Sequence, residues 1–193
     1  MVQSAFAFQT DAFASPVPAL LYDEVHWYAC HTRARHEKKA ATCLEQRGVE
    51  SFLPTVERET LWSDRVKRVA FPLFPGYVFG RFTLDELARV LATHGVVGVV
   101  KLRGYPTPIP CAEIENVRRA CRVASETGAE TDVEARFPTG VWVRVTSGPF
   151  VGLEGIVIEA RGGQRVRVGI RAIGRSLDVV VGTATLEPIS GPS

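Results

Sequence analysis

The chain has 193 residues, a formal net charge of +2 and 46% hydrophobic residues, which is a globular composition. This length suits one domain, or one of ordinary size with a small second one, and it allows a sizeable core. No run of 18 apolar residues is present, which argues against a membrane-spanning helix, and the apolar N-terminal stretch lacks the basic residues of a signal peptide.

The positive charge is concentrated in the middle of the chain. Residues 27–82 contain ten Lys/Arg against six Asp/Glu, whereas residues 1–26 contain three acids and no base. A local basic excess permits contact with nucleic acid without demonstrating it.

Cysteines and histidines lack the spacing of a metal site. His26, His31 and His36 recur every five residues, which matches neither strand nor helix periodicity, so we expect no metal and no cofactor. The cysteines contain no C-x-x-C pair, and we read them as free thiols in a reducing cytoplasm. They are Cys30, Cys43, Cys111 and Cys121.

The first ordered elements are expected just before residue 30. Residues 1–25 show no sustained periodicity and predict a flexible tail. Trp27–Cys30 reads as a strand. A helix follows over residues 33–47, and Gly48 ends it in the left-handed conformation.

One face of this expected helix is basic. Arg35, Lys38 and Lys39 lie opposite an apolar face that contains Ala40 and Leu44. The basic face is either simply solvated or follows the phosphates of a nucleic acid.

An aromatic stretch, Phe71–Phe82, lies at the centre of the chain. Pro72 and Pro75 lack backbone donors, so we expect the segment up to Gly76 to be extended or turning rather than paired in a central strand. Tyr77–Phe82 reads as a strand with aromatic side chains on both faces. Either both faces are covered, or one aromatic set lies at the surface and binds a partner.

The remaining elements up to residue 124 complete an α+β domain. We expect an antiparallel sheet flanked by about three helices over residues 26–124. The expected elements are a hairpin of Ser51–Thr60 with Arg65–Val69, a capping box at Thr83–Glu86 before a helix that ends at Gly95, a strand over Val96–Leu102 and a helix over Ala112–Ala124.

A composition change marks a second domain. Residues 125–136 are acidic and poor in apolar residues, which predicts a linker. Beyond it, short alternating strands separated by glycine turns are typical of a small all-β barrel, which we place at residues 137–189. Its strands are expected near residues 141–145, 155–159, 165–170 and 177–181.

No motif for catalysis is present. The sequence has no phosphate-binding glycine loop, no nucleophile elbow and no His-Glu-x-x-His. Cys30 and His31 are the one pair of neighbours that could act as nucleophile and base. Because adjacent residues of a strand point to opposite faces, their side chains would not meet. We therefore expect no enzyme.

Several motifs together resemble transcription elongation and antitermination factors of the NusG type. Trp27-Tyr28, Phe52-Leu-Pro54 and Pro72-Leu-Phe-Pro-Gly-Tyr-Val-Phe79 resemble their N-terminal NGN domain. The Ser147–Gly155 stretch and Ile173-Gly-Arg175 resemble the KOW barrel, SH3-like in fold, that follows it. The likeness covers residues 26–189 in the family's order. The end of the chain looks more like the specialised paralogues of the RfaH, UpxY and LoaP kind, which prevent termination.

The resemblance implies a monomeric factor that binds RNA polymerase at the clamp helices of its largest subunit, close to the upstream and non-template DNA. The residues that it implies for polymerase binding are Phe74, Pro75, Tyr77, Phe79 and His31. The residues that it implies for contact with DNA are Arg35, Lys38 and Lys39.

The resemblance also implies a second partner for the barrel, which is either the termination factor Rho or a small-subunit ribosomal protein. The matching positions are Phe150, Leu153, Ile173 and Arg175. Phe150 and Ile173 are alternatively plain barrel core. One paralogue has a KOW domain that refolds as helices, but Val166, Val168 and Val179–Val181 favour strand here, so we expect a constant barrel.

An RNA-binding module that works without polymerase is the second hypothesis. It would act through the basic helix and through Arg165, Arg167 and Arg171, which the strand period places on one face of the barrel. Plain solvation of that face is the alternative.

Overall fold

The computed structural model describes residues 23–62, 65–127, 131–134, 140–160, 163–182 and 186–191. The tail predicted for residues 1–25 lies outside these residues except for its last three, and so does the tip of the predicted hairpin at residues 63 and 64. Within the described ranges, no helix is long and apolar enough to cross a membrane.

A four-stranded antiparallel sheet forms the centre of the N-terminal domain. Its strands are β1 (His26–Thr32), β2 (Glu50–Phe52), β5 (Tyr77–Phe82) and β6 (Val96–Val99), in the order β2-β5-β1-β6. The aromatic strand β5 pairs with β1 on one side and with β2 on the other. This inner position explains why β5 has apolar side chains on both faces.

Both faces of this sheet are covered. Phe82 packs with Tyr28 on the face that α2 (Glu37–Gln46) covers, and their ring centroids lie 4.8 Å apart. Phe79 packs on the other face, and both phenylalanines are fully buried. Of the two alternatives for the aromatic side chains of this strand, the one in which both faces are covered therefore holds for Phe79 and Phe82.

Helix α2 begins later than predicted. Arg35 has a φ of 62°, in the left-handed region, which interrupts the helix expected from residue 33, so α2 starts at Glu37. Its end agrees with the prediction, because Gly48 has a φ of 77°. The amides of Val49 and Gly48 donate to the carbonyls of Leu44 and Glu45, which closes the helix.

The segment after β5 follows the predicted capping box. The Thr83 amide donates to the Glu86 carboxylate at 3.1 Å, and the Thr83 hydroxyl completes the reciprocal bond. The short helices η1 (Leu84–Glu86) and α3 (Leu87–Leu91) follow. The predicted strand over residues 96–102 is divided at Val100 into β6 and β7 (Lys101–Leu102), and β7 pairs with β8 (Tyr105–Pro106).

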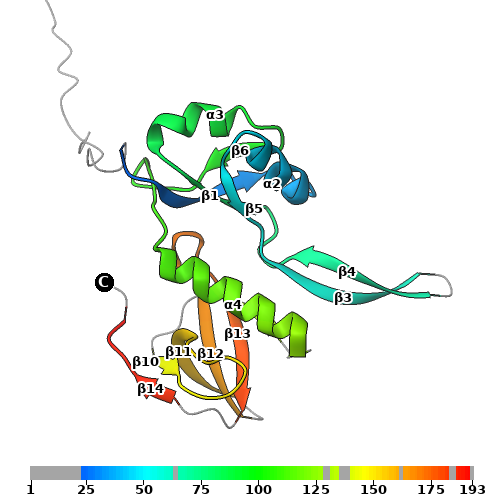
Figure 1. Cartoon of the computed structure of the whole chain (residues 1–193), viewed down its shortest axis with the longest axis vertical. Coiled ribbons are helices and arrows are strands. Elements are labelled where there is room, and N and C mark those ends of the chain that lie inside the picture. Colours follow the sequence, from blue (N-terminus) through cyan, green and yellow to red (C-terminus); the bar gives the residue numbers. More distant parts are fainter. Residues whose placement is uncertain are drawn as a thin grey trace, which may run out of the picture.

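A two-stranded arm extends from the N-terminal domain (Figure 1). It consists of β3 (Thr55–Trp62) and β4 (Arg65–Pro72). Phe71 and Pro72 stay out of a central strand, as expected, but β4 continues past Val69, where the strand was expected to end, so that they lie opposite Val56 and Thr55 in the arm. In a two-stranded ribbon each strand has a free edge, and proline is tolerated at an edge position.

Helix α4 (Cys111–Thr127) lies between the N-terminal sheet and the C-terminal domain (Figure 1). It is longer than the helix predicted over residues 112–124. The stretch predicted as a linker therefore contains the end of α4 and the strand β9 (Thr131–Glu134), which pairs with β13 (Arg175–Gly182) of the C-terminal domain.

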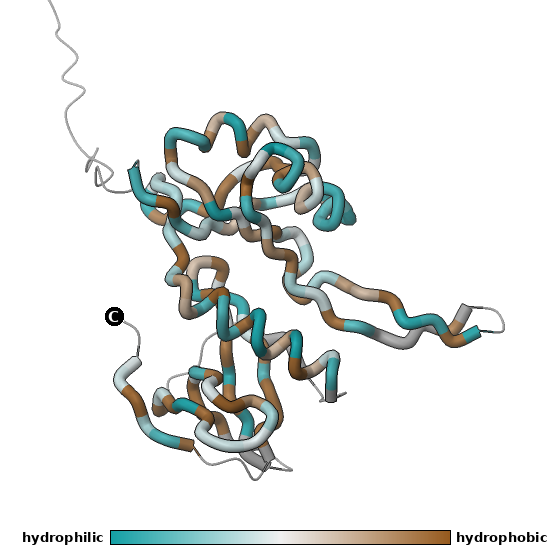
Figure 2. Tube along the Cα trace, in the orientation of Figure 1, coloured by the Kyte–Doolittle hydropathy of each residue, from teal (hydrophilic) through white to brown (hydrophobic). Residues whose placement is uncertain are grey.

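The C-terminal domain is a six-stranded antiparallel sheet in the order β14-β10-β11-β12-β13-β9. The four predicted strands are present, and the sequence pattern missed β14 and β9. The remaining strands are β10 (Trp142–Val145), β11 (Glu154–Ala160), β12 (Gly163–Ile170) and β14 (Leu186–Pro188), with the short helix η2 (Arg171–Ile173) between β12 and β13. Figure 2 shows the hydrophobic residues distributed along these strands. The all-β fold predicted for this domain is confirmed.

Arg165 and Arg167 of β12 and Arg171 of η2 do not form one solvated face. Arg167 is 6% exposed and its guanidinium forms a bidentate ion pair with Asp178, which is 3% exposed. Arg171 donates to Glu113 of α4. Two of the three arginines expected to hold RNA are therefore engaged within the protein, which corrects that expectation.

Removing the buried carboxylate should destabilise the C-terminal domain. In Asp178→Ala the Arg167 guanidinium stays buried without its counter-charge, and breaking such a pair costs about 3–5 kcal/mol. Chemical denaturation should report this loss. Glu187→Ala, at an exposed position of β14, is the matched control and should change the free energy of unfolding by less than about 0.5 kcal/mol. Equal stabilities for the two variants would contradict a structural role for the ion pair.

The cysteines should differ sharply in reactivity. Burial raises the pKa of the Cys30 thiol to about 12, so almost no thiolate forms near neutral pH, whereas Cys111 is exposed. At pH 8 an aromatic disulfide reagent should modify Cys111 readily and Cys30 only after unfolding. Mass spectrometry of the wild type and of Cys111→Ser would identify the modified positions. Rapid labelling of Cys30 in the folded protein would contradict its burial.

Candidate functional site

Three of the predicted polymerase-binding residues lie together at one end of the N-terminal sheet. His31 on β1 and Tyr77 on β5 are direct partners in the antiparallel register, and their ring centroids lie 4.9 Å apart. Both side chains are half-buried, and Pro75, in the turn that precedes β5, is exposed. We call these three residues the aromatic end of the sheet.

The other two predicted residues lie beneath this surface. Phe74 is 1% exposed and Phe79 is fully buried, and their rings make an edge-to-face contact with centroids 6.2 Å apart. Phe52 of β2 packs on Phe79 at a centroid distance of 6.1 Å. In this structure Phe74 and Phe79 therefore support the aromatic end rather than presenting free rings.

The turn before Tyr77 is held from two sides. The Gly76 amide donates to the Glu37 carboxylate at 2.9 Å, and the Gly76 carbonyl accepts from the Thr32 amide at 2.8 Å. Gly76 has a φ of 84°, which only glycine adopts readily. The first residue of α2 thus positions the turn that carries Pro75.

The three predicted DNA-contacting residues, Arg35, Lys38 and Lys39, are all exposed at the start of α2. Within the described part of the chain, none of the three forms an ion pair. His94, next to β6, extends the same positive surface, because Arg33 donates its amide to the Gly95 carbonyl and so brings the two segments together.

Positive charge accumulates at this surface. The pKa of His94 is lowered below its usual value. The charge of Lys39 is the largest cause, followed by burial and then by the charges of His36 and Arg33. The rings of His36 and His94 have centroids 5.8 Å apart. This arrangement favours the binding of an anion, which would relieve the repulsion among the cations.

The four predicted partner-binding residues of the C-terminal domain are not equally accessible. Phe150 is 4% exposed and Leu153 is fully buried, whereas Ile173 is half-buried and Arg175 is exposed. Phe150 and Leu153 belong to one hydrophobic cluster that continues through α4 into the N-terminal sheet.

Polar side chains of α4, spaced three residues apart, hold the loops of the C-terminal domain. Glu113 accepts from the Arg171 side chain at 2.5 Å and from its amide at 3.0 Å. Asn116 accepts from the Glu154 amide at 3.1 Å, and Arg119 donates to the Val151 carbonyl at 2.7 Å. Residues spaced in this way share one helix face. Helix α4 therefore covers the loop that contains Phe150 and Leu153.

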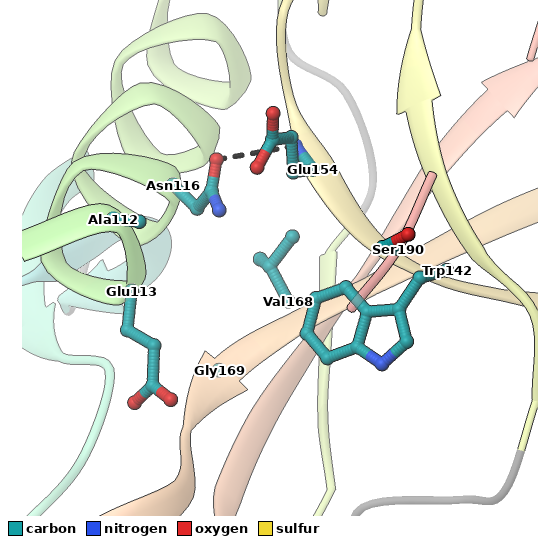
Figure 3. A pocket seen from close by; sticks show the side chains of 8 residues that line it. All are labelled: Ala112, Glu113, Asn116, Trp142, Glu154, Val168, Gly169 and Ser190. Atoms are coloured by element: carbon teal, nitrogen blue, oxygen red, sulfur yellow. Dashed lines mark hydrogen bonds between the residues drawn. The ribbon is translucent and has the colours of Figure 1, made fainter. Parts of the chain in front are cut away.

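A small pocket of about 100 Å³ lies in the same interface (Figure 3). Glu113 and Asn116 of α4 line one side of it, and Trp142 and Val168 of the C-terminal domain line the other. Figure 3 also shows the Asn116 amide oxygen against the Glu154 backbone. The pocket is a gap between packed domains, and among the described residues no group of three or more His, Cys, Asp or Glu could hold a metal.

Sequence reasoning missed His94, Glu37 and the polar face of α4. Arg33 meets Gly95 only because β1 and β6 are neighbours in the sheet, and no local pattern shows that pairing. The spacing of Glu113, Asn116 and Arg119 was visible in the sequence, but nothing there showed that a second domain covers them.

Comparisons with known proteins agree with this architecture. The family model "Transcription termination factor nusG" matches residues 25–118. The chain is similar to the transcription termination/antitermination protein NusG of Thermus thermophilus, with 30% identity covering 80% of this chain and 94% of that protein. It is also 28% identical to NusG of Pseudomonas aeruginosa, covering 84% of this chain and 98% of that one.

A solved structure of Thermotoga maritima NusG, described as showing a domain interaction in that protein, has 25% identity to the chain and a TM-score of 0.46. It covers 88% of this chain and 99% of that chain. The identity and coverage of the Thermus relative, together with the matching family model, show that the chain belongs to the NusG family of transcription termination/antitermination proteins.

Proposed function

We propose that the protein binds RNA polymerase through the aromatic end of its N-terminal sheet and modulates pausing and termination during elongation. The observation that carries this proposal is the close pair of His31 and Tyr77 rings, tilted by 41° and half-buried beside the exposed Pro75. Aromatic side chains on a rigid, well-packed base are the residues that most often dominate binding energy at protein interfaces. The clamp helices of the largest polymerase subunit are the proposed contact.

The positive surface at the start of α2 is proposed to face the upstream or non-template DNA. Lys38 and Lys39 extend from the helix whose first residue, Glu37, holds the Gly76 turn, and Arg35 lies two residues before that helix. A protein bound through the aromatic end would therefore hold these cations at a fixed offset from its polymerase contact. Such contacts with phosphates fix position without reading the sequence.

A second partner of the C-terminal domain is proposed to bind at Phe150, Leu153, Ile173 and Arg175. Helix α4 covers the first two of these residues in the described structure, so this partner has to displace α4 from the loop or bind after the domains separate. Rho and a small-subunit ribosomal protein are the proposed partners.

The other function classes gain less support. An RNA-binding module based on β12 loses Arg167 and Arg171 to internal ion pairs. An enzyme built on Cys30 and His31 would need a thiolate, and burial raises the pKa of Cys30 to about 12. We therefore propose that the protein is a binding factor and not an enzyme.

The charge environment of His94 can be tested by titration. Lys39→Ala removes the cation that lowers the His94 pKa most, so the pKa should rise towards that of an ordinary histidine. NMR titration of the imidazole signals would measure it. Lys101→Ala changes an exposed lysine on β7 and serves as the control, which should leave the His94 pKa unchanged. An unaltered pKa in Lys39→Ala would contradict the arrangement of cations described above.

Polymerase binding should depend on Tyr77. Tyr77→Ala removes one ring of the His31–Tyr77 pair, and losing an interface anchor of about 2 kcal/mol would weaken binding roughly thirtyfold. The measurement is a titration of core RNA polymerase with the full-length protein. Phe79→Ala is a poor probe, because truncating a fully buried phenylalanine costs about 3–5 kcal/mol of stability.

Val97→Ala, at a residue of β6 that is 58% exposed, is the matched control for this titration and should bind as the wild type does. Thermal unfolding of each variant would show that the fold is intact. A wild-type protein that fails to bind polymerase would refute the proposed function, and a Tyr77→Ala variant with wild-type affinity would place the contact elsewhere.

A further inference from the structure

A groove of about 570 Å³ separates the start of α2 from strand β4 of the arm. The side chains that line the groove are Arg35, Glu37 and Lys38 from the α2 side and Val69, Ala70, Phe71, Pro72, Leu73 and Pro75 from the other.

The β4 wall of the groove is apolar and partly open to solvent. Phe71 is 40% exposed, Pro75 is exposed, and Val69 is half-buried, whereas Leu73 is 2% exposed and closes the floor. An exposed phenylalanine beside an exposed proline is the composition of a contact surface rather than of a solvated strand.

The α2 wall is positively charged. Arg35 and Lys38 are exposed at the rim. The third charged residue, Glu37, is 7% exposed, and the Gly76 amide satisfies its carboxylate, so its negative charge is directed at the turn rather than at the opening. Arg35 also has a φ of 62°, and an arginine held in this uncommon conformation at a rim is a feature that often accompanies a binding role.

The outer edge of β4 has no strand partner in the part of the chain that the structure describes, where β4 pairs with β3 alone. A free strand edge can hydrogen-bond to an extended chain, whereas a helix satisfies its own backbone groups. The groove therefore suits an extended segment with apolar side chains for the β4 wall and carboxylates for Arg35 and Lys38.

We propose that this groove binds an extended acidic segment of RNA polymerase, whose apolar side chains pack on Phe71 and Pro75 and whose carboxylates pair with Arg35 and Lys38. The inference rests on the proposed polymerase binding, and Pro75 joins the groove to the aromatic end of the sheet. The two surfaces together form one continuous contact on either side of the Gly76 turn.

A protein segment fits this groove better than a nucleic acid does. Six of its nine lining residues are apolar, which suits the apolar side chains of a protein segment and gives the phosphates of a nucleic acid no contact along most of the groove. The groove thus assigns Arg35 and Lys38 to polymerase rather than to DNA, and it leaves Lys39 and His94, which do not line it, as the proposed contacts with DNA.

Groove variants of the full-length protein test the proposal by titration with core RNA polymerase. Phe71→Ser and the double variant Arg35→Glu with Lys38→Glu should each weaken polymerase binding by tenfold or more. The charge reversal should also flatten the salt dependence of binding, because it removes ion pairs that salt screens. The double variant changes only exposed side chains, so it still tests the groove if Phe71→Ser disrupts the folding of the arm.

Matched controls are Leu61→Ser, which removes an apolar residue that is 77% exposed near the end of the arm, and Lys101→Glu, which reverses an exposed charge on β7. Both should bind polymerase within twofold of the wild type. Equal losses in the controls and in the groove variants would overturn the proposal, since the effect would then come from overall charge or from the arm as a whole.

The outcomes separate this proposal from the proposed function. If the groove variants bind polymerase with wild-type affinity while Tyr77→Ala loses binding, the proposal for the groove is overturned and the aromatic end remains the contact. A wild type that does not bind polymerase would overturn both. Groove variants that bind polymerase normally but lose affinity for a forked DNA without polymerase would show that the groove holds nucleic acid, and would also overturn the proposal.

Discussion

The shared packing of helix α4 is the constraint on which the described structure depends. Ile114, Val117 and Ala120 are fully buried, and they join the N-terminal sheet and the C-terminal domain in a single hydrophobic cluster. The polar residues of the same helix hold the loops of the C-terminal domain through Glu113, Asn116 and Arg119. Separating the domains would expose apolar surface and break these bonds, so accessibility of the Phe150 loop is set by the free energy of this one interface.

Much of the fold could be predicted because its signals are local. Gly48 ended its helix as expected, Thr83 and Glu86 formed their capping box, and alternating residues marked the strands of the C-terminal domain. The errors occurred where a local rule competed with pairing. The strand expected to end at Val69 continues to Pro72 in a two-stranded arm, where an edge is free, and the φ of Arg35 shortened a helix whose composition favoured an earlier start.

The candidate site was less predictable than the fold, for a physical reason. An aromatic residue has the same sequence signal whether it binds a partner or fills a core, and burial depends on neighbours that are distant in the chain. Phe74 and Phe79 proved to be buried, whereas Tyr77, in the same stretch, is half-buried beside His31. Likewise Arg167 met Asp178 through the pairing of β12 with β13, which strand periodicity alone does not reveal. The family resemblance indicated which residues are candidates for partner binding. Only the three-dimensional packing shows which of these side chains lie at the surface and which are buried beneath it.

The bond from Gly76 to Glu37 links the proposed surfaces mechanically. Glu37 is the first residue of α2, so a single carboxylate connects the helix that presents Lys38 and Lys39 to the turn that presents Pro75 and Tyr77. The Thr32 amide donates to the Gly76 carbonyl, in the next peptide unit, and Thr32 follows His31 at the end of β1. A turn fixed by two hydrogen bonds has little freedom to adjust when one surface is occupied. A protein bound through the aromatic end would therefore hold its basic surface and its groove in a set orientation, because all three depend on the position of Gly76.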